Sequence, residues 1–302
     1  KDEKEFYARL DQMMDLAARS LSIKRNVIST LLKNGLYPYT ACYLTDFDNH
    51  FSSIGVIGMN EAGLNARWLK AGLESGETKK FAVSVLNHMR EKLIGYQMEY
   101  GNLYGLEATP AESATFRFAR LDRERFSRIR TAGHEGDVPY YTNSTKLPAD
   151  YDGTLQDALI NQDSLQPLYT TGTVFHVYME RELEDWRKAR DLLSSMITEH
   201  HIPCFTLSPV YTICQTCGYL PGRQERCPKC NGAADVYSRI AGYYRPVHDW
   251  NDGKAQEFRN RIMFRIPTYA MSPSTRIHSC SFVYFKFCGK FIMIVLEFIL
   301  FK

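Results

Sequence analysis

Apolar side chains recur at spacings of three and four residues in four stretches of the chain, which is the period of an amphipathic helix. The first two stretches occupy residues 6–21 and 27–32, and the pair Asn34-Gly35 then predicts a helix end before Pro38. The same spacing returns at residues 81–93 and 183–196. The apolar positions are Phe6, Leu10, Met13, Ala17 and Leu21; Val27, Ile28, Leu31 and Leu32; Phe81, Val85, Met89 and Leu93; and Leu183, Trp186, Ala189, Leu193 and Met196.

Short apolar runs lie between these helices and predict buried strands. They occupy residues 49–61, 173–177 and 204–211, and the segment 101–113 reads as a strand, a turn and a helix start. Strands that alternate with helices favour an α/β fold with a mostly parallel sheet. Residues 131–168 are instead rich in Gly, Asp, Asn, Ser and Pro, which predicts a loop with short ordered stretches.

Two segments place polar residues where α/β proteins bind ligands. Asn60 and Glu61 close the first strand, and strand ends face the active site in an α/β barrel. Asn60 is alternatively the cap of the helix that follows. Pro110 and Glu112 predict the first turn of a helix whose free N–H groups suit a phosphate, and Thr109 is alternatively a plain N-cap.

Composition narrows the class of protein. The chain has 302 residues and 44% hydrophobic content, which is enough for one large domain or two smaller ones. A net charge of +3 is too small to predict nucleic-acid binding, which favours a strongly basic face. Eight cysteines and no signal peptide at the N-terminus predict a reducing, cytoplasmic location and no membrane association.

Four of the cysteines form two CxxC pairs separated by nine residues: Cys214, Cys217, Cys227 and Cys230. Glycines and prolines around them supply tight turns, so four thiolates are expected to surround one zinc ion at ~2.3 Å. A closed four-thiolate site leaves no open position, which predicts a structural zinc rather than a catalytic one. A zinc ribbon that binds nucleic acid has the same spacing, but the basic residues here are interrupted by Gln224 and Glu225.

The pentapeptide Arg-Ile-Ala-Gly-Tyr at residues 239–243 follows the cysteines. A glycine that loses an α-hydrogen leaves a radical that the flanking amide nitrogen and carbonyl stabilise, with no side chain to hinder planarity. The alternative is that Gly242 supplies a turn with positive φ, as many glycines do.

The order of these features resembles the C-terminal region of the anaerobic (class III) ribonucleoside-triphosphate reductases, which are glycyl radical enzymes. Behind the CxxC pairs and the sequence Ser-Arg-Ile-Ala-Gly-Tyr, residues 250–258 read Trp-Asn-x-Gly-Lys-x-x-Glu-Phe. The resemblance extends upstream through residues 37–40, 49–55, 107–112, 141–144 and 169–176, in the family's order. Thr171 departs from the pattern, because the family commonly has two glycines there.

The resemblance implies a fold and a set of site residues. Residues 1–208 are expected to form the second half of a ten-stranded α/β barrel, and residues 209–261 a small zinc-binding, glycyl-radical region. The radical is assigned to Gly242, and substrate binding to Thr109, Ala111, Glu112 and Asn60. Residues 262–302 are an atypical apolar tail, for which a reading-frame shift in the source is our interpretation. Its last apolar run is broken by Glu297 and is shorter than the ~20 residues that span a bilayer.

The implied activity is the anaerobic reduction of ribonucleoside triphosphates to 2′-deoxyribonucleoside triphosphates by a glycyl and thiyl radical mechanism. The implied partners are an activating enzyme with an iron-sulfur cluster and S-adenosylmethionine, the nucleotide substrate, and a second copy in a homodimer. Formate is the expected reductant, and ATP or dNTP effectors are expected to bind upstream of these residues. The thiyl cysteine is expected outside this chain, since neither Cys42 nor Cys204 matches its position.

Two other hypotheses remain at this point. A glycyl radical lyase of the pyruvate formate-lyase type shares the Arg-x-x-Gly-Tyr loop, but no cysteine quartet is expected ahead of it. A non-enzymatic zinc-binding module would bind the metal and form no glycine radical.

Overall fold

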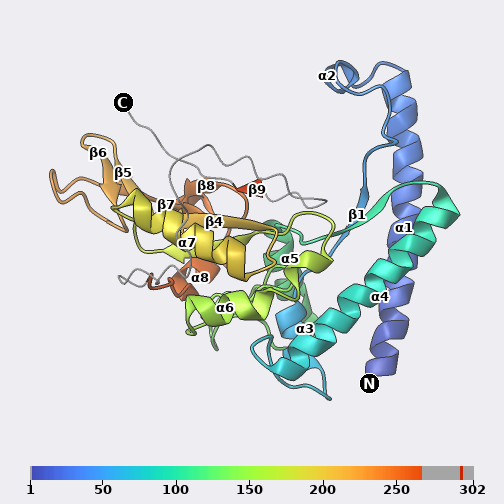
Figure 1. The fold of residues 1–302 in the computed structure, drawn as a ribbon, viewed down its shortest axis with the longest axis horizontal. Coiled ribbons are helices and arrows are strands. Elements are labelled where there is room, and N and C mark those ends of the chain that lie inside the picture. Colours follow the sequence, from blue (N-terminus) through green and yellow to red (C-terminus); the bar gives the residue numbers. More distant parts are fainter. Residues whose placement is uncertain (1, 267–292, 295–302) are drawn as a thin grey trace.

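The computed structural model describes residues 2–266 and 293–294. Its most prominent element is α1 (Glu3–Lys33), which packs along α4 (Gly76–Tyr100) at one side of the molecule (Figure 1). Two separate helices were expected across residues 6–32, and the structure shows one instead. Buried Arg25 lies in the stretch between the two predicted runs and donates to the carbonyl oxygens of Phe47 and His50, which holds this stretch against the loop that follows. The predicted end at Asn34-Gly35 is confirmed, with Gly35 at φ 76°.

The first parallel pair of strands is β1 (Ser52–Gly55) and β2 (Tyr104–Glu107). The strand predicted over residues 49–61 is therefore shorter than expected. Gly58, at φ 77°, turns the chain into α3 (Met59–Asn65), so Asn60 and Glu61 lie on a helix rather than at a strand end. This pair of strands, α1, α3 and α4 enclose one hydrophobic core. The short helix α2 (Pro38–Ala41) begins at Pro38, before which the preceding helix was expected to end.

A second parallel sheet is formed by β3 (Phe175–Met179), β4 (Cys204–Pro209) and β9 (Met293–Ile294). It packs with α6 (Leu155–Gln162) and α7 (Trp186–Glu199) around a second core. Most of the segment 131–168 is irregular as predicted, apart from α6, and the turn η1 (Gln166–Leu168) follows α6. Together these elements give the expected α/β architecture.

The chain leaves the parallel sheet after Pro209 and enters a four-stranded antiparallel sheet of order β6-β5-β7-β8. These strands are β5 (Tyr211–Cys214), β6 (Gly218–Pro221), β7 (Ala234–Arg239) and β8 (Tyr244–Pro246). The ring of Tyr211 contacts those of Tyr219, Tyr237 and Tyr244, with centroid separations of 5.2–5.8 Å. This aromatic column ties all four strands together.

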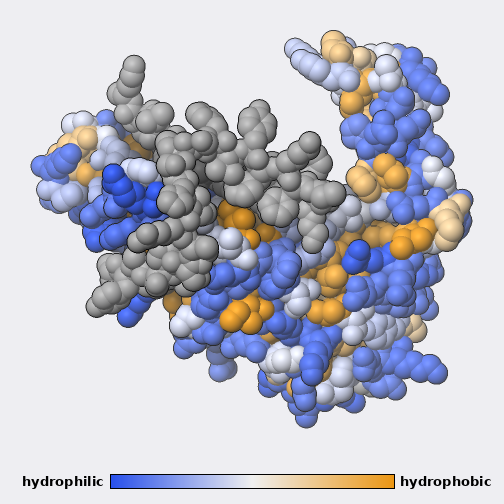
Figure 2. Space-filling model, viewed as in Figure 1, coloured by the Kyte–Doolittle hydropathy of each residue, from blue (hydrophilic) through white to orange (hydrophobic). Residues whose placement is uncertain are grey.

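Two helical elements follow the antiparallel sheet: η2 (Val247–Asp249) and α8 (Asp252–Asn260). Helix α8 packs against α5 (Ser113–Arg125). Of the helices within the described residues, none is long and apolar enough to cross a bilayer. Figure 2 shows apolar side chains at the surface over α1 and α4, where Ile23, Val27 and Ile94 are exposed. The predicted tail at residues 262–302 lies mostly outside the described residues.

Candidate functional site

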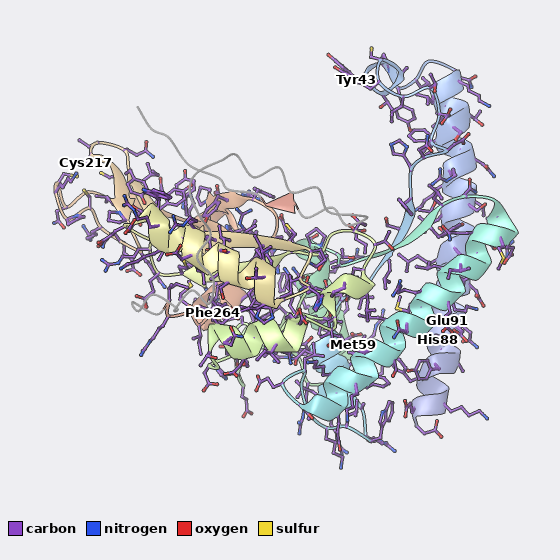
Figure 3. The ribbon with its side chains drawn as sticks, viewed as in Figure 1. Tyr43, Met59, His88, Glu91, Cys217 and Phe264 are labelled. Carbon is purple, nitrogen blue, oxygen red and sulfur yellow. The ribbon has the colours of Figure 1, made fainter. Side chains whose placement is uncertain are left out.

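The four cysteines converge at one end of the antiparallel sheet. Cys214 ends β5 and Cys217 lies in the turn to β6, while Cys227 and Cys230 lie in the loop before β7 (Figure 3 labels Cys217). Their Sγ atoms all lie within 4.8 Å of one another, and those of Cys214 and Cys230 are 3.6 Å apart. Four ligands at ~2.3 Å from a tetrahedral ion would be ~3.8 Å apart, so the cluster fits a zinc ion.

Backbone amides favour the thiolate form at Cys227, whereas the contact with Cys230 raises the pKa of the Cys217 thiol to about 12. The N–H of Cys230, followed by that of Lys229, lowers the pKa of the Cys227 thiol to about 6. Cys214 and Cys227 are buried and Cys217 is half-buried, so three of the four sulfur ligands have little contact with solvent. A set of four sulfur donors is compatible with a soft metal ion such as zinc.

Residues 240–243 form the tight loop between β7 and β8. Arg239 pairs with Tyr244 at its base, and the N–H of Ile240 donates to the carbonyl of Tyr243 at 3.0 Å. Gly242 is exposed at its tip, outside the left-handed region of φ. A Cβ built on Gly242 meets no atom of the described residues within 4 Å. The hypothesis of a positive-φ turn is therefore wrong, and neither backbone conformation nor space requires a glycine here.

Arg239 fixes the orientation of the glycine's carbonyl. Its side chain is buried, and Nη1 donates to the Gly242 oxygen at 2.6 Å while Nε donates to Ser208 Oγ at 3.1 Å. The guanidinium also lies 4.9 Å from the ring centroid of Tyr244. A charged donor at such a distance makes a strong hydrogen bond, so the loop is ordered although its tip is exposed.

The hydrogen bond from Arg239 to Ser208 is the first of a series that runs into the parallel sheet. Its hydroxyl is 3.0 Å from that of Thr206, which lies 2.6 Å from Nδ1 of His176. Burial, and then the ammonium of Lys146, hold the pKa of His176 well below its usual range. His176 is thus a neutral, hydrogen-bonded histidine within the core.

Charged side chains of α8, and of Arg261 directly after it, connect this helix to the loop of residues 240–243. Lys254 Nζ lies 2.5 Å and Arg261 Nη2 3.0 Å from the two carboxylate oxygens of Glu257. Burial alone would raise the pKa of Glu257, but these two cations lower it. Arg261 Nη1 also donates to the carbonyl oxygen of Arg239 at 3.2 Å, which connects α8 to the base of the glycine loop.

The sequence motif at residues 250–258 is explained by these contacts. Asn251 caps α8 by accepting from the N–H of Lys254 at 3.0 Å, and it donates to the carbonyl of Glu112 at 3.3 Å. Gly253 allows α8 to approach α5, because a Cβ there would lie 2.6 Å from Cβ of Phe116. The motif therefore caps α8 and packs it against α5.

A glycine-to-alanine pair tests this packing. Gly253→Ala is expected to lower the free energy of unfolding by about 1–3 kcal/mol, because the new methyl group must displace Phe116 or part the helices. Gly95→Ala, in α4, is the matched control, since its Cβ meets nothing within 4 Å. It should raise stability by about 0.5–1 kcal/mol. Urea denaturation of the two variants measures both; equal changes would contradict the α5–α8 contact.

Comparison with known proteins identifies the family. A family model described as anaerobic ribonucleoside-triphosphate reductase matches residues 1–264. The chain belongs to this family. The Haemophilus influenzae enzyme of that name is 24% identical over 288 residues, covering 87% of this chain and 40% of the relative. The enzyme of phage T4 is also 24% identical, with 86% and 45% covered.

Solved structures of anaerobic ribonucleotide reductases share this fold. One has a TM-score of 0.72 at 22% identity and covers 87% of this chain and 42% of the solved one. The reductase of Thermotoga maritima, solved with dATP in its specificity site, has a TM-score of 0.68 at 22% identity, with 83% and 41% covered. The chain thus spans about 40% of the length of the curated reductases it matches first.

Within this reductase-family chain, the predicted phosphate-binding segment precedes α5. The helix begins at Ser113, not at Pro110, so Thr109 is not its N-cap. The hydroxyl of Thr109 instead lies against the backbone of Gly55, where a Cβ would approach it to 1.7 Å. Its N-cap residue, Glu112, makes no capping hydrogen bond with its side chain.

Of the remaining predicted substrate residues, Ala111 and Asn60 are buried and Glu112 is half-buried. Ala111 is 7% exposed and Asn60 4%. Asn60 accepts from the N–H of Leu73 at 2.9 Å and donates to Glu61 at 3.0 Å, so its amide stabilises the turn before α4. The structure does not show Asn60 beside the glycine loop. Its role in substrate binding stays a prediction, as do those of Thr109, Ala111 and Glu112.

Sequence reasoning missed a cavity beside the glycine loop. Ile240 and Ala241 line it together with Lys146, His176, Glu257 and Arg261. Lys146 lies two residues after the family motif at residues 141–144, and this proximity was the one available signal. His176 comes from β3, Glu257 from α8 and Arg261 from the residue after α8, and only folding brings them together.

Proposed function

We propose that this chain is the glycyl-radical-bearing part of an anaerobic ribonucleoside-triphosphate reductase, with the radical on Gly242. The observation that carries the proposal is the unexplained glycine at the tip of an ordered loop. Among the described residues, Gly242 is exposed, meets no atom that would exclude a side chain, and has its carbonyl held by Arg239. A stable α-carbon radical requires that residue 242 has no side chain. The fold of the described residues does not require this.

The arrangement suits formation of that radical. An activating enzyme with an iron-sulfur cluster and S-adenosylmethionine would remove one α-hydrogen from the exposed loop. Donation by Arg239 to the Gly242 oxygen favours electron density on that oxygen, into which the unpaired electron delocalises. A radical in contact with oxygen is lost, so the function is anaerobic.

In the proposed reaction the glycyl radical takes hydrogen from a cysteine thiol outside these residues, and the resulting thiyl takes the 3′-hydrogen of the ribose. The 2′-hydroxyl then leaves as water. Formate is the proposed reductant: HCOO⁻ and H⁺ convert the C2′–OH to C2′–H and yield CO₂ and H₂O. The cysteine thiol finally returns the 3′-hydrogen to the sugar and becomes a thiyl radical again.

The rest of the chain is assigned by the same proposal. The parallel strands would belong to the second half of a ten-stranded barrel in residues 1–208, and residues 209–261 would form the zinc-binding radical region. The four cysteines would hold a structural zinc that supports the sheet flanking the loop. Substrate phosphates would bind at the uncapped start of α5, and exposed apolar residues of α1 would pack against further protein, including a second subunit.

Electron paramagnetic resonance tests the proposal. The full-length protein and the 302-residue chain are incubated anaerobically with activating enzyme, reductant and S-adenosylmethionine. We expect a carbon-centred doublet that collapses to a singlet when glycine is deuterated at the α-carbon. Air should then cleave the chain at Gly242, which mass spectrometry detects. A zinc-loaded, folded full-length protein without a doublet would overturn the assignment, whereas a signal in that protein alone would show that activation needs upstream residues.

A further inference from the structure

A series of hydrogen bonds leads from His176 to the carbonyl oxygen of Gly242. Nδ1 of His176 lies 2.6 Å from Oγ1 of Thr206, and this hydroxyl lies 3.0 Å from Oγ of Ser208. Ser208 accepts from Nε of Arg239 at 3.1 Å, and Nη1 of Arg239 donates to the Gly242 oxygen at 2.6 Å. The series therefore runs from β3 and β4 of the parallel sheet to β7 of the antiparallel sheet (Figure 1).

The register of the parallel strands brings these groups together. His176 lies opposite Thr206 in the pairing of β3 with β4, and Ser208 follows two residues later on the same face of the sheet. His176, Thr206, Ser208 and Arg239 are all buried. A buried hydroxyl without a partner is costly, so each hydroxyl depends on its neighbours in the series for its hydrogen bonds.

The two ends of the series set the direction of its bonds. Arg239 can only donate, so Ser208 Oγ is an acceptor at that end. Burial and nearby cations hold the pKa of His176 well below its usual range, so the neutral ring has a single N–H. A hydrogen bond with the backbone of Ala241 acts in the opposite sense on this pKa, as a carbonyl acceptor does. The proton therefore belongs on Nε2, Thr206 donates to Nδ1, and Ser208 donates to Thr206.

The series fixes the guanidinium of Arg239. A guanidinium is planar and rigid, so an acceptor that holds Nε also sets the direction of the bond from Nη1 to Gly242. The bond from His176 reaches Ala241 on the other side of the glycine. Both peptide groups that flank the α-carbon of Gly242 are thus held from the interior, although the tip of the loop is exposed.

We propose that His176, Thr206 and Ser208 are positioning residues for the radical: through Arg239 they hold the Gly242 carbonyl in the plane onto which the unpaired electron spreads. The inference rests on the proposed radical at Gly242. It adds a role for side chains of β3 and β4, which belong to the parallel sheet rather than to the loop.

Thr206→Val tests the proposal in the full-length protein, activated under anaerobic conditions, because valine has a similar shape and no hydroxyl. We expect the doublet to form with an altered splitting and to decay at least about threefold faster, as suits the loss of one buried hydrogen bond. Double resonance should also show a weaker coupling to the exchangeable proton that Arg239 donates. Thr198→Val removes an exposed hydroxyl from α7 and is the matched control, with an unchanged spectrum and lifetime.

Two histidine variants test the direction of the bonds. The amide oxygen of asparagine can take the place of Nδ1 and accept from Thr206, whereas phenylalanine offers no acceptor. His176→Asn should therefore keep the exchangeable-proton coupling that His176→Phe weakens. Nitrogen NMR of labelled histidine in the unactivated protein should show the proton of His176 on Nε2.

The outcomes separate this inference from the radical assignment. A doublet whose splitting, proton coupling and lifetime are unchanged in Thr206→Val would overturn the inference and leave the radical on Gly242, as would a proton on Nδ1 of His176. If Thr206→Val does not fold, Ser208→Ala removes the next hydroxyl of the series and is judged by the same criteria. No doublet in the unchanged, folded full-length protein would instead overturn the radical assignment, and this inference with it.

Discussion

Gly242→Ala is expected to abolish the radical completely and leave the fold intact. The Cβ would enter open space and φ lies in a region that alanine adopts, so stability should stay unchanged or rise by up to about 1 kcal/mol. The methyl group occupies the position of one α-hydrogen and hinders the planar radical. The structure thus separates the chemical need for glycine from any structural need.

The measurement is a pair of spectra on activated protein. The unchanged chain should show the glycyl doublet and the alanine variant none, while urea denaturation shows equal or greater stability for the variant. Gly253→Ala is the informative comparison, because it should lower stability through Phe116 and yet keep the radical in the molecules that fold. A folded Gly242→Ala protein that retains the doublet would place the radical elsewhere.

Cys227→Ser is expected to reduce bound zinc from one ion per chain to nearly none and to loosen the sheet β5–β8. Cys227 is the most buried of the four ligands at 1% exposure, and its loss leaves three thiolates around the ion. Structural zinc sites in small domains contribute apparent binding energies of ~10–16 kcal/mol, so this is the largest stability change we expect from a single side chain.

Metal analysis by mass spectrometry and hydrogen exchange measure the two effects. Cys42→Ser is the control, because Cys42 is exposed and lies outside the cluster, and it should keep its zinc and its protection. Since β7 and β8 flank the glycine loop, the radical yield of Cys227→Ser should fall with the protection of these strands. Unchanged hydrogen exchange in β5–β8 after complete zinc loss would show that the aromatic column around Tyr211 holds the sheet without the metal.

Patterns within short stretches of sequence predicted much of this fold. The three-and-four spacing located α1, α4 and α7, because one apolar stripe on a helix requires only neighbouring residues. The two CxxC pairs predicted the cysteine cluster for a similar reason: each pair sits in its own tight turn. Boundaries were less accurate at Asn60 and Pro110, where a glycine turn and a late helix start changed the element that carries each residue.

The sequence by itself therefore determined the α/β class, the cysteine cluster and the family, which depend on local periodicity, spacing and the order of motifs. Only the tertiary structure decided that Gly242 has no steric reason to be glycine and that Arg239 holds its carbonyl. The same is true of the cavity beside the glycine loop, where Lys146, His176 and Glu257 come together from distant parts of the chain. Contacts between residues a hundred positions apart depend on how the whole chain packs, so a local sequence pattern does not predict them.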